Sequence, residues 1–205
     1  MFFLIRLIIT IAMLISIGLV GKKLKVRKNR LQYVLTVVIG IVVITLLSVV
    51  PLENLFVDFK SPQAAYEYTS WGDPDIELIV EGHNCDFVVE RQDATYVYGI
   101  VPKTEKGWQI GIGSNTNTIM EYSDGSVLAT IFQYNDTEDF FITIFYADGG
   151  AYEVRDSCNS TFYSLERTDT VLEKEYITYF AHITNYSQDY SIKINETHID
   201  LPRQQ

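Results

Sequence analysis

The sequence lacks every motif that would identify a reaction. It contains no G-x-S-x-G segment, and the glycine-containing stretch 111–118 has no lysine and no following helix, so it does not match a phosphate-binding loop. The three histidines and two cysteines show no spacing typical of a metal site, and no acidic cluster matches a twelve-residue EF-hand loop. We therefore expect no catalytic residue, no metal site and no cofactor.

Basic residues are scarce after residue 52. All 26 Asp and Glu lie beyond that point, together with only nine of the 16 Lys and Arg, so the first 52 residues carry a net charge of +7 and the remainder −17. A nucleic-acid interface needs a basic surface to neutralise phosphates. This charge distribution excludes nucleic acid as a partner of the acidic part.

Two long apolar runs, at residues 1–20 and 33–50, contain Arg6 as their one charged residue. At about 1.5 Å per residue, each run would reach roughly 27–30 Å as a helix, which matches the hydrocarbon thickness of a bilayer. The pattern predicts a transmembrane hairpin over residues 1–52, with helices at about 1–20 and 33–50.

The loop between these runs, residues 21–32, is strongly basic. Under the positive-inside rule, its cationic residues would act as topology determinants that keep the loop in the cytoplasm. This predicts a two-pass cell-membrane protein with both termini extracytoplasmic and the lipid bilayer as a partner. Two alternatives stay open, the opposite orientation and a cleaved signal peptide at 1–20. The six determinants are Lys22, Lys23, Lys25, Arg27, Lys28 and Arg30.

Residues 53–75 are expected to form a juxtamembrane segment with a short helix. Its first part has apolar residues at helical spacing and would lie either along the membrane or under the following domain. Ser61 followed by Pro62 is typical of a helix start and predicts a helix over 62–70. Trp71 and the turn residues 72–74 would end that helix.

From residue 76 the apolar residues recur with a period of two, separated by polar turn clusters. This predicts an extracytoplasmic, mainly antiparallel β domain over 76–205, built as a curved sheet or sandwich. The fold class expected for the whole chain is α+β, a two-helix transmembrane hairpin followed by a short helix and this β domain. The expected strands are 76–81, 86–91, 95–101, 108–113, 127–134, 140–147, 151–155, 161–165, 176–183 and 190–195.

Only two cysteines occur, Cys85 and Cys158. Outside the cytoplasm they could form a disulfide, which would stabilise the fold by roughly 4 kcal/mol on the chain-entropy model. The alternative is two unrelated thiols. Cys85 also lies two residues after His83, and an enzyme that uses Cys85 with a histidine is the catalytic alternative.

The segment with Ser61, Pro62, Ala65 and Tyr68, followed by β-hairpins with a K-T-x-x-G-W step at 103–108, resembles small membrane-anchored proteins of Gram-positive bacteria that have an extracytoplasmic β domain and no assigned function. The resemblance implies a cell-surface location and no catalytic residue.

No catalytic activity is evident in the sequence. The predicted function is therefore a membrane-anchored extracytoplasmic binding or interaction module, whose partner would be an envelope protein or a glycan. The alternatives are a small anchored envelope enzyme that uses Cys85 with a histidine, and an accessory subunit of a membrane complex.

Overall fold

The structure is a computed structural model that describes residues 2–23, 30–49, 51–70, 72–93, 95–111, 116–146, 152–169 and 174–203. The helical elements of these residues come first, and they are α1 (Phe2–Lys23), α2 (Arg30–Val49), the 3-10 helix η1 (Leu52–Leu55) and α3 (Pro62–Thr69). The strands follow as β1 (Asp75–Glu81), β2 (Cys85–Gln92), β3 (Thr95–Thr104), β4 (Gly107–Trp108), β5 (Thr116–Ser123), β6 (Val127–Tyr134), β7 (Phe140–Tyr146), β8 (Val154–Asp156), β9 (Tyr163–Asp169), β10 (Lys174–Ile183), β11 (Ser191–Ile194) and β12 (Thr197–Asp200).

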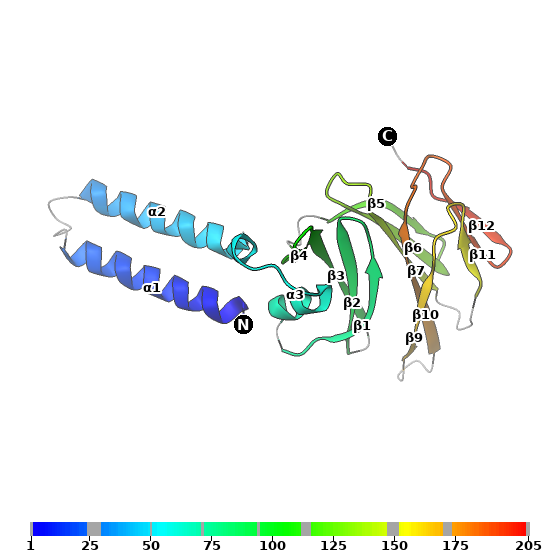
Figure 1. Ribbon diagram of the computed structural model, residues 1–205, viewed down its shortest axis with the longest axis horizontal. Helices are drawn as coiled ribbons and strands as arrows, with labels where there is room; N and C mark the ends of the chain where they lie inside the picture. The colour runs from blue at the N-terminus through cyan, green and yellow to red at the C-terminus, as the bar shows by residue number, and fades with distance from the viewer. Residues whose placement is uncertain are drawn as a thin grey trace.

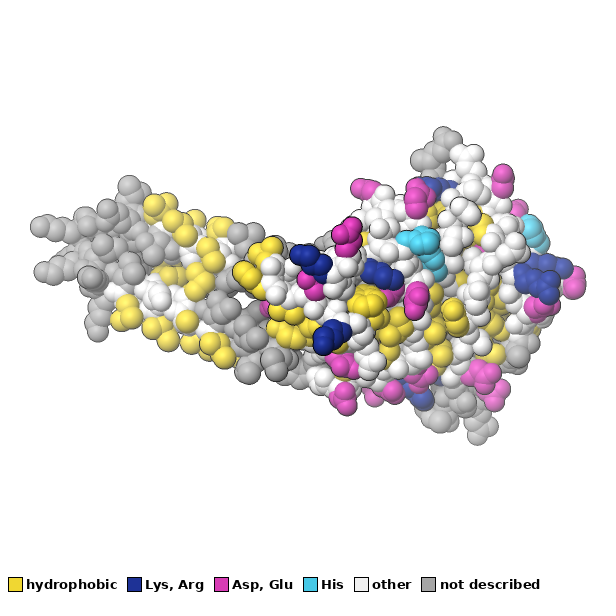
Figure 2. Space-filling view, in the orientation of Figure 1, with side chains coloured by type: hydrophobic (Ala, Val, Ile, Leu, Met, Phe, Trp, Pro, Cys, Tyr) yellow, Lys and Arg dark blue, Asp and Glu magenta, His cyan; other side chains and the backbone are white. Residues whose placement is uncertain are grey.

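Helices α1 and α2 lie side by side and extend away from the sheets (Figure 1). Gly40 of α2 faces Ile17 of α1, and an added Cβ at residue 40 would collide with that isoleucine side chain. Apolar side chains such as Leu14 and Ile39 are exposed on the two helices. Figure 2 shows these apolar atoms on the visible face of the pair, whereas the acidic side chains gather over the β part.

The prediction of a transmembrane hairpin is wrong. Crossing a bilayer takes about 20 consecutive, mostly apolar residues in one helix. Within the described residues, no helix combines the length and the apolarity that this requires. In α1, Arg6 and Lys22 bound an uncharged stretch at residues 7–21.

Two further predictions depended on that hairpin. The two-pass membrane location, with both termini extracytoplasmic, is a wrong prediction because the described helices do not meet the requirement for a span. The fold class is mainly β with curled antiparallel sheets, in place of the predicted α+β class with a membrane hairpin.

The segment after α2 packs against the first sheet. Asn54 exchanges two hydrogen bonds with the backbone of Ile110, at 2.8 and 3.0 Å. Phe59 pairs through its backbone with Trp108 of β4, at 2.8 and 3.0 Å. Of the two placements considered for this segment, these contacts favour packing under the β domain.

Helix α3 begins where the local sequence predicts. The Ser61 hydroxyl accepts a hydrogen bond from the Ala64 backbone N–H at 3.1 Å, and Pro62 occupies the first turn, where a missing N–H carries no penalty. The helix ends at Thr69, one residue before the predicted end, and Trp71 lies outside the described residues. Ala65 is buried against Val88 and Val101, so α3 covers the outer face of the first sheet.

The strands form three antiparallel sheets. The first has the order β1-β2-β3-β4, the central one β5-β6-β7-β10-β9, and the third β12-β11-β8. Figure 1 shows them following one another away from α1 and α2. Strand β10 is inserted between β7 and β9, so the centre of the central sheet joins segments far apart in the chain.

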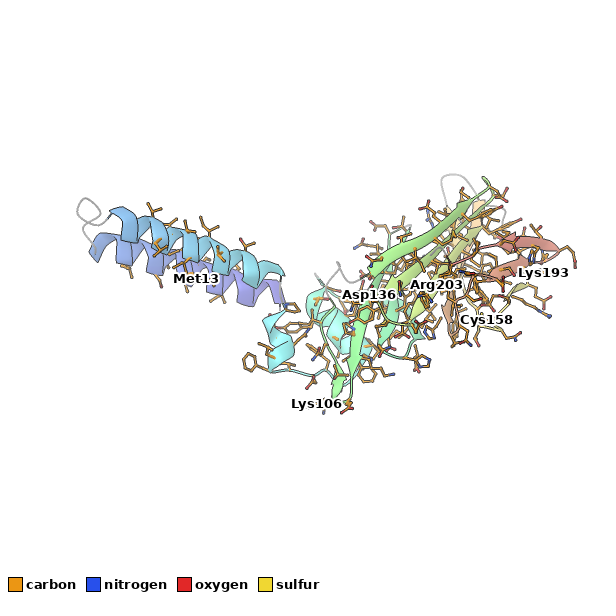
Figure 3. The ribbon with its side chains drawn as sticks, turned by 90° about the horizontal axis from the view of Figure 1, so that it is seen from above. Met13, Lys106, Asp136, Cys158, Lys193 and Arg203 are labelled. Carbon is orange, nitrogen blue, oxygen red and sulfur yellow. The ribbon has the colours of Figure 1, made fainter. Side chains whose placement is uncertain are left out.

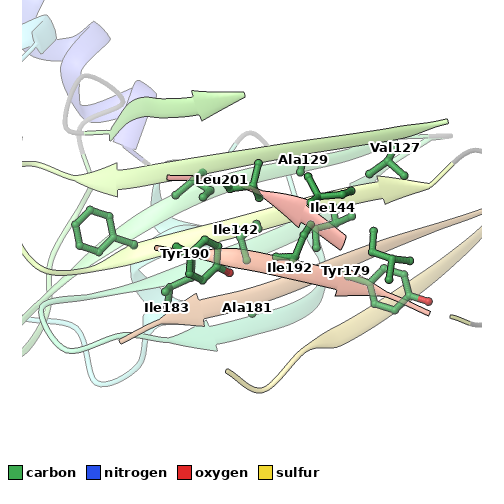
Figure 4. Packing of buried hydrophobic residues seen from close by; sticks show 14 of the residues in the cluster. Val127, Ala129, Ile142, Ile144, Tyr179, Ala181, Ile183, Tyr190, Ile192 and Leu201 are labelled. Carbon is green, nitrogen blue, oxygen red and sulfur yellow. The ribbon is translucent and has the colours of Figure 1, made fainter. Parts of the chain in front are cut away.

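Apolar side chains cover the central sheet on both of its faces. Phe141 of β7 and Phe180 of β10 pack with Phe87 of the first sheet in one cluster. Ile142 of β7 belongs to a second cluster, shared with Ile192 of the third sheet (Figure 4). A strand buried on both faces needs apolar residues at consecutive positions, which explains the run FFITIFY in β7, where Thr143 is the one residue that is not apolar.

Most strands lie close to their predicted ranges, but β5 and β12 were missed. The pairing of β5 with β6 shifts register between Thr118 and Met120, so an extra residue breaks the period-two pattern there. Strand β12 has four residues, of which Ile199 is buried and the other three are exposed. Neither segment shows the alternation on which a sequence-based assignment depends.

We expect Ile142→Ala to lower the free energy of unfolding by about 2–5 kcal/mol, because it opens a cavity in the middle of the central sheet. Leu128→Ala, on the adjacent strand β6, is the matched control: Leu128 is 38% exposed, so the loss should stay under about 1 kcal/mol. Urea unfolding followed by circular dichroism measures both. Equal losses would contradict the central position of β7.

Candidate functional site

A fully buried carboxylate, Asp139, links the first and central sheets. It immediately precedes β7 and has an exposed fraction of 0%. Its two oxygens accept hydrogen bonds from the backbone N–H groups of His83 and Asn84, at 2.8 and 2.6 Å, and from the Asn84 side-chain amide at 2.9 Å. The turn between β1 and β2 is thereby fixed to the central sheet.

Asp139 also holds a histidine. The His182 Nε2 atom lies 2.9 Å from Asp139 Oδ1, and the His182 side chain is 11% exposed. The rings of His83 and Phe141 pack against it at centroid distances of 5.3 and 5.1 Å. The orientation of the His182 ring is therefore fixed by a carboxylate and by two neighbouring rings.

The charge state of Asp139 follows from these contacts. Burial alone would raise the pKa of this carboxyl group, but hydrogen bonds from His182, His83 and Asn84 outweigh burial and hold the pKa well below its usual range. Asp139 is therefore ionised at neutral pH, and its carboxylate oxygens act only as hydrogen-bond acceptors for the groups around it.

His182 lines a cleft of about 360 Å³, which we call the polar cleft. Its walls come from the end of β1, the segment that leads into β9, and the end of β10. The cleft opens where the edge of the first sheet meets the edge of the central sheet. The lining residues are Ile79, Val80, Glu81, Asn159, Ser160, Thr161, Tyr163, His182 and Thr184.

The chemistry of the polar cleft is that of a hydrogen-bonding site. Seven of its nine lining residues have polar side chains, and none of the nine is Lys or Arg. Tyr163 is 44% exposed. The Ser160 hydroxyl is buried and has no hydrogen-bond partner among the residues that the structure describes. A buried polar atom without a partner is unusual and costs free energy that a ligand or water can recover.

Cys85, the residue expected to act in the catalytic alternative, is fully buried in the cluster between the first and central sheets. Burial and the nearby carboxylates Asp139 and Asp86 raise the pKa of its thiol. Because the thiolate is the nucleophilic form, a buried and protonated Cys85 is unsuited to covalent catalysis.

The two cysteines lie on opposite faces of the central sheet. Cys85 belongs to the cluster with Phe87, whereas Cys158 packs against the cluster with Ile142 and Ile192. Figure 3 places Cys158 on the side of the β part that faces away from α1 and α2. Both are free thiols in the structure, so the predicted disulfide is not formed there.

The other residues singled out from the sequence lie elsewhere. Lys22 and Lys23 end α1 and Arg30 begins α2, while Lys25, Arg27 and Lys28 lie outside the described residues. The predicted role of these six basic residues as topology determinants depended on membrane spans, which the described helices do not provide. His198 is exposed, with its Nε2 atom 3.0 Å from Asp200 Oδ1. In the described part of the chain, no three His, Cys, Asp or Glu side chains are placed to hold a metal ion.

The pair Asp139–His182 was not predicted from the sequence, in which neither residue belongs to a recognised motif. The available signal was the position of Asp139 directly before the apolar run of β7. The identity of its partner, His182, could not be inferred from the sequence. The two residues meet only because the β7–β10 register places Phe141 opposite His182, with 40 residues between them in the chain.

Comparison with known proteins adds no relative, since no family model, curated protein or solved structure matches the chain. The resemblance to small proteins of Gram-positive bacteria, which rests on Ser61, Pro62 and the segment 103–108, therefore stays a prediction. The class that the fold and the cleft define is a three-sheet antiparallel β protein with a polar surface cleft.

We expect Asp139→Asn to lower the free energy of unfolding by roughly 2–5 kcal/mol at pH 7, because an amide supplies one acceptor oxygen where the carboxylate supplies two. The folded pKa of Asp139 lies below the unfolded value of about 3.9, so its contribution is present above that value and is lost as pH falls. Denaturant titrations between about pH 2 and pH 7 should show a smaller pH dependence in this variant than in the wild type.

Asp136→Asn, on the same turn but exposed, is the matched control for that experiment. This variant should have the same free energy of unfolding as the wild type at neutral pH. It should also lose a similar amount of stability as the pH falls. If both variants lost the same stability, the network around Asp139 would not hold the two sheets together.

We expect two reactive thiols per chain when the unreduced protein is denatured and titrated with Ellman's reagent. In the folded protein Cys85 should be unreactive, because it is buried and its pKa is raised. Cys158→Ser should therefore remove the native signal, and Cys85→Ser should retain it. An absence of thiols in the denatured, unreduced protein would show that the disulfide forms.

Proposed function

We propose that the chain is a binding module that recognises a saccharide in the polar cleft. The proposal rests on the composition of the cleft. Its described lining combines hydroxyl, amide, carboxylate and imidazole side chains and includes no Lys or Arg. A saccharide presents many hydroxyl groups, each both a donor and an acceptor, and such groups match this lining.

The charges near the cleft disfavour an anionic ligand. Glu81 lines the cleft, and the ionised Asp139 lies directly behind His182. The part of the chain that follows residue 52 carries a net charge of −17, as nine basic residues oppose 26 acidic ones. An anion would approach against this field, so the ligand is neutral or cationic.

The size and shape of the cleft favour a small ligand. Its volume of about 360 Å³ lies at the lower end of the roughly 300–1,000 Å³ typical of small-molecule sites. Tyr163 presents an exposed ring at the cleft, and an aromatic face is a suitable surface for the C–H face of a sugar ring. His182, fixed by Asp139, supplies a hydrogen-bonding nitrogen without a further loss of side-chain entropy.

The same observations support binding over catalysis. The thiol of Cys85, the nucleophile of the catalytic alternative, is buried and stays protonated. A module that holds a ligand needs neither an activated nucleophile nor a metal ion.

The test is a glycan array probed with the full chain, followed by calorimetry on the best neutral sugar. We expect Tyr163→Ala to weaken binding about three- to tenfold, because stacking on an aromatic ring contributes roughly 0.5–1.5 kcal/mol. Tyr163→Phe keeps the ring and should retain most of the affinity. Leu128→Ala is the matched control, since Leu128 is 38% exposed but lies outside the cleft.

Preferential binding of sulfated or sialylated glycans would contradict the proposal, as would equal weakening by Tyr163→Ala and Leu128→Ala. An array without any bound glycan would exclude saccharides as the ligand.

A further inference from the structure

A second cavity lies on the other flank of the first and central sheets, between α3, β3 and the strands β5 and β6. Its volume is about 390 Å³. Its walls include the rings of Tyr66, Tyr98 and Phe132, and hydroxyl groups come from Thr69 and Thr118. We call it the ring pocket. It shares no lining residue with the polar cleft.

Tyr66 forms a rigid wall of the ring pocket. Its hydroxyl donates a hydrogen bond to Glu90 Oε2 at 2.8 Å. Its ring lies directly over Gly99 of β3, where an added Cβ would be 2.8 Å from the Tyr66 Cε2 atom. A glycine at position 99 therefore lets the ring lie flat against the strand. Burial, together with the bonded Glu90, raises the pKa of the Tyr66 hydroxyl, so the ring stays neutral.

A packed aromatic pair lines the pocket on the other face of β3. The rings of Tyr98 and Phe132 have centroids 5.1 Å apart, and Tyr98 stacks on Phe87 at 5.1 Å with an interplanar angle of 24°. Phe87 and Phe132 are both buried, whereas Tyr98 is 43% exposed. One face of the Tyr98 ring is therefore occupied by the core, and part of the ring remains open to a ligand.

Among the residues that the structure describes, no charged residue lines the ring pocket, although the surrounding domain is strongly acidic. A charged ligand would lose its hydration there without gaining an ionic partner. Aromatic rings instead prefer offset or edge-to-face contacts with other rings, and the threonine hydroxyls offer hydrogen bonds near the apolar walls. An apolar cavity with a few polar groups is the usual form of a small-molecule site.

We propose that the ring pocket is a second binding site, specific for a small uncharged molecule that has an aromatic ring and a hydroxyl group. The aromatic ring of the ligand packs against the Tyr98–Phe132 pair beside the edge of β3, and its hydroxyl group bonds to a threonine side chain that lines the pocket. This site is independent of the saccharide proposal, because the two cavities have different walls and select different chemistry.

The test titrates the full chain with p-cresol and follows it by calorimetry and by chemical-shift changes in a two-dimensional NMR spectrum. We expect saturable binding in the millimolar range or tighter. Cyclohexanol, which has no aromatic ring, and benzoate, which is charged, should each bind at least fivefold more weakly. Tyr98→Leu should weaken p-cresol binding at least fivefold, and Tyr163→Leu in the polar cleft should leave it unchanged.

A second variant covers the case in which Tyr98→Leu does not fold. Thr118 is exposed on β5, so Thr118→Trp should fold and should fill the mouth of the pocket, which abolishes p-cresol binding. The proposal is overturned if p-cresol does not bind to the wild type. It is also overturned if benzoate binds as tightly, or if the folded Thr118→Trp variant binds like the wild type.

Discussion

The hydrogen bonding of one buried carboxylate connects the parts of this fold. Asp139 is removed from water, which is costly for a charged group unless donors replace the lost hydration. Here two backbone N–H groups, one side-chain amide and His182 surround it. Because three of these donors belong to the turn between β1 and β2, the carboxylate fixes the first sheet at one end of the central sheet.

Hydrophobic contacts continue that connection along the interface. From the turn, β2 runs with Cys85, Phe87 and Val89 facing the central sheet, and Val88 facing α3. Phe87 lies at the centre of an aromatic group, with its ring 5.2 Å from that of Phe141. The two cavities open on the two flanks of this interface, where the sheets diverge. The same packing thus holds the sheets together and leaves space at their edges.

Local chemistry was readable from the sequence, and long-range pairing was not. The start of α3 follows from a serine cap and a proline in the first turn, both of which act within four residues. Strand β7 follows from its own apolar run. The Asp139–His182 pair depends on the register of β7 with β10, which no local pattern specifies. Strand β5 was missed because a register shift interrupts its alternation.

The membrane interpretation shows a different limit. Residues 1–52 were assigned to a membrane hairpin from the lengths of two apolar runs and from the positive charge of the loop between them. The described residues contain no helix that is long and apolar enough for a span. The length and apolar composition of a run, even with Arg6 as its one charged residue, did not predict whether the folded chain has such a helix.

The insertion of β10 between β7 and β9 has a consequence for synthesis. The first sheet is complete in the chain by Trp108, but one of the strands that cover its inner face ends only at Ile183. A chain growing on the ribosome therefore carries Phe87 and Phe141 without the cover of Phe180 while the intervening residues are made. Nonlocal pairing of this kind is slow, because a long loop must close before its contacts form. Folding of this protein is thus completed late, and the nascent chain exposes an aromatic surface to chaperones until β10 has been added.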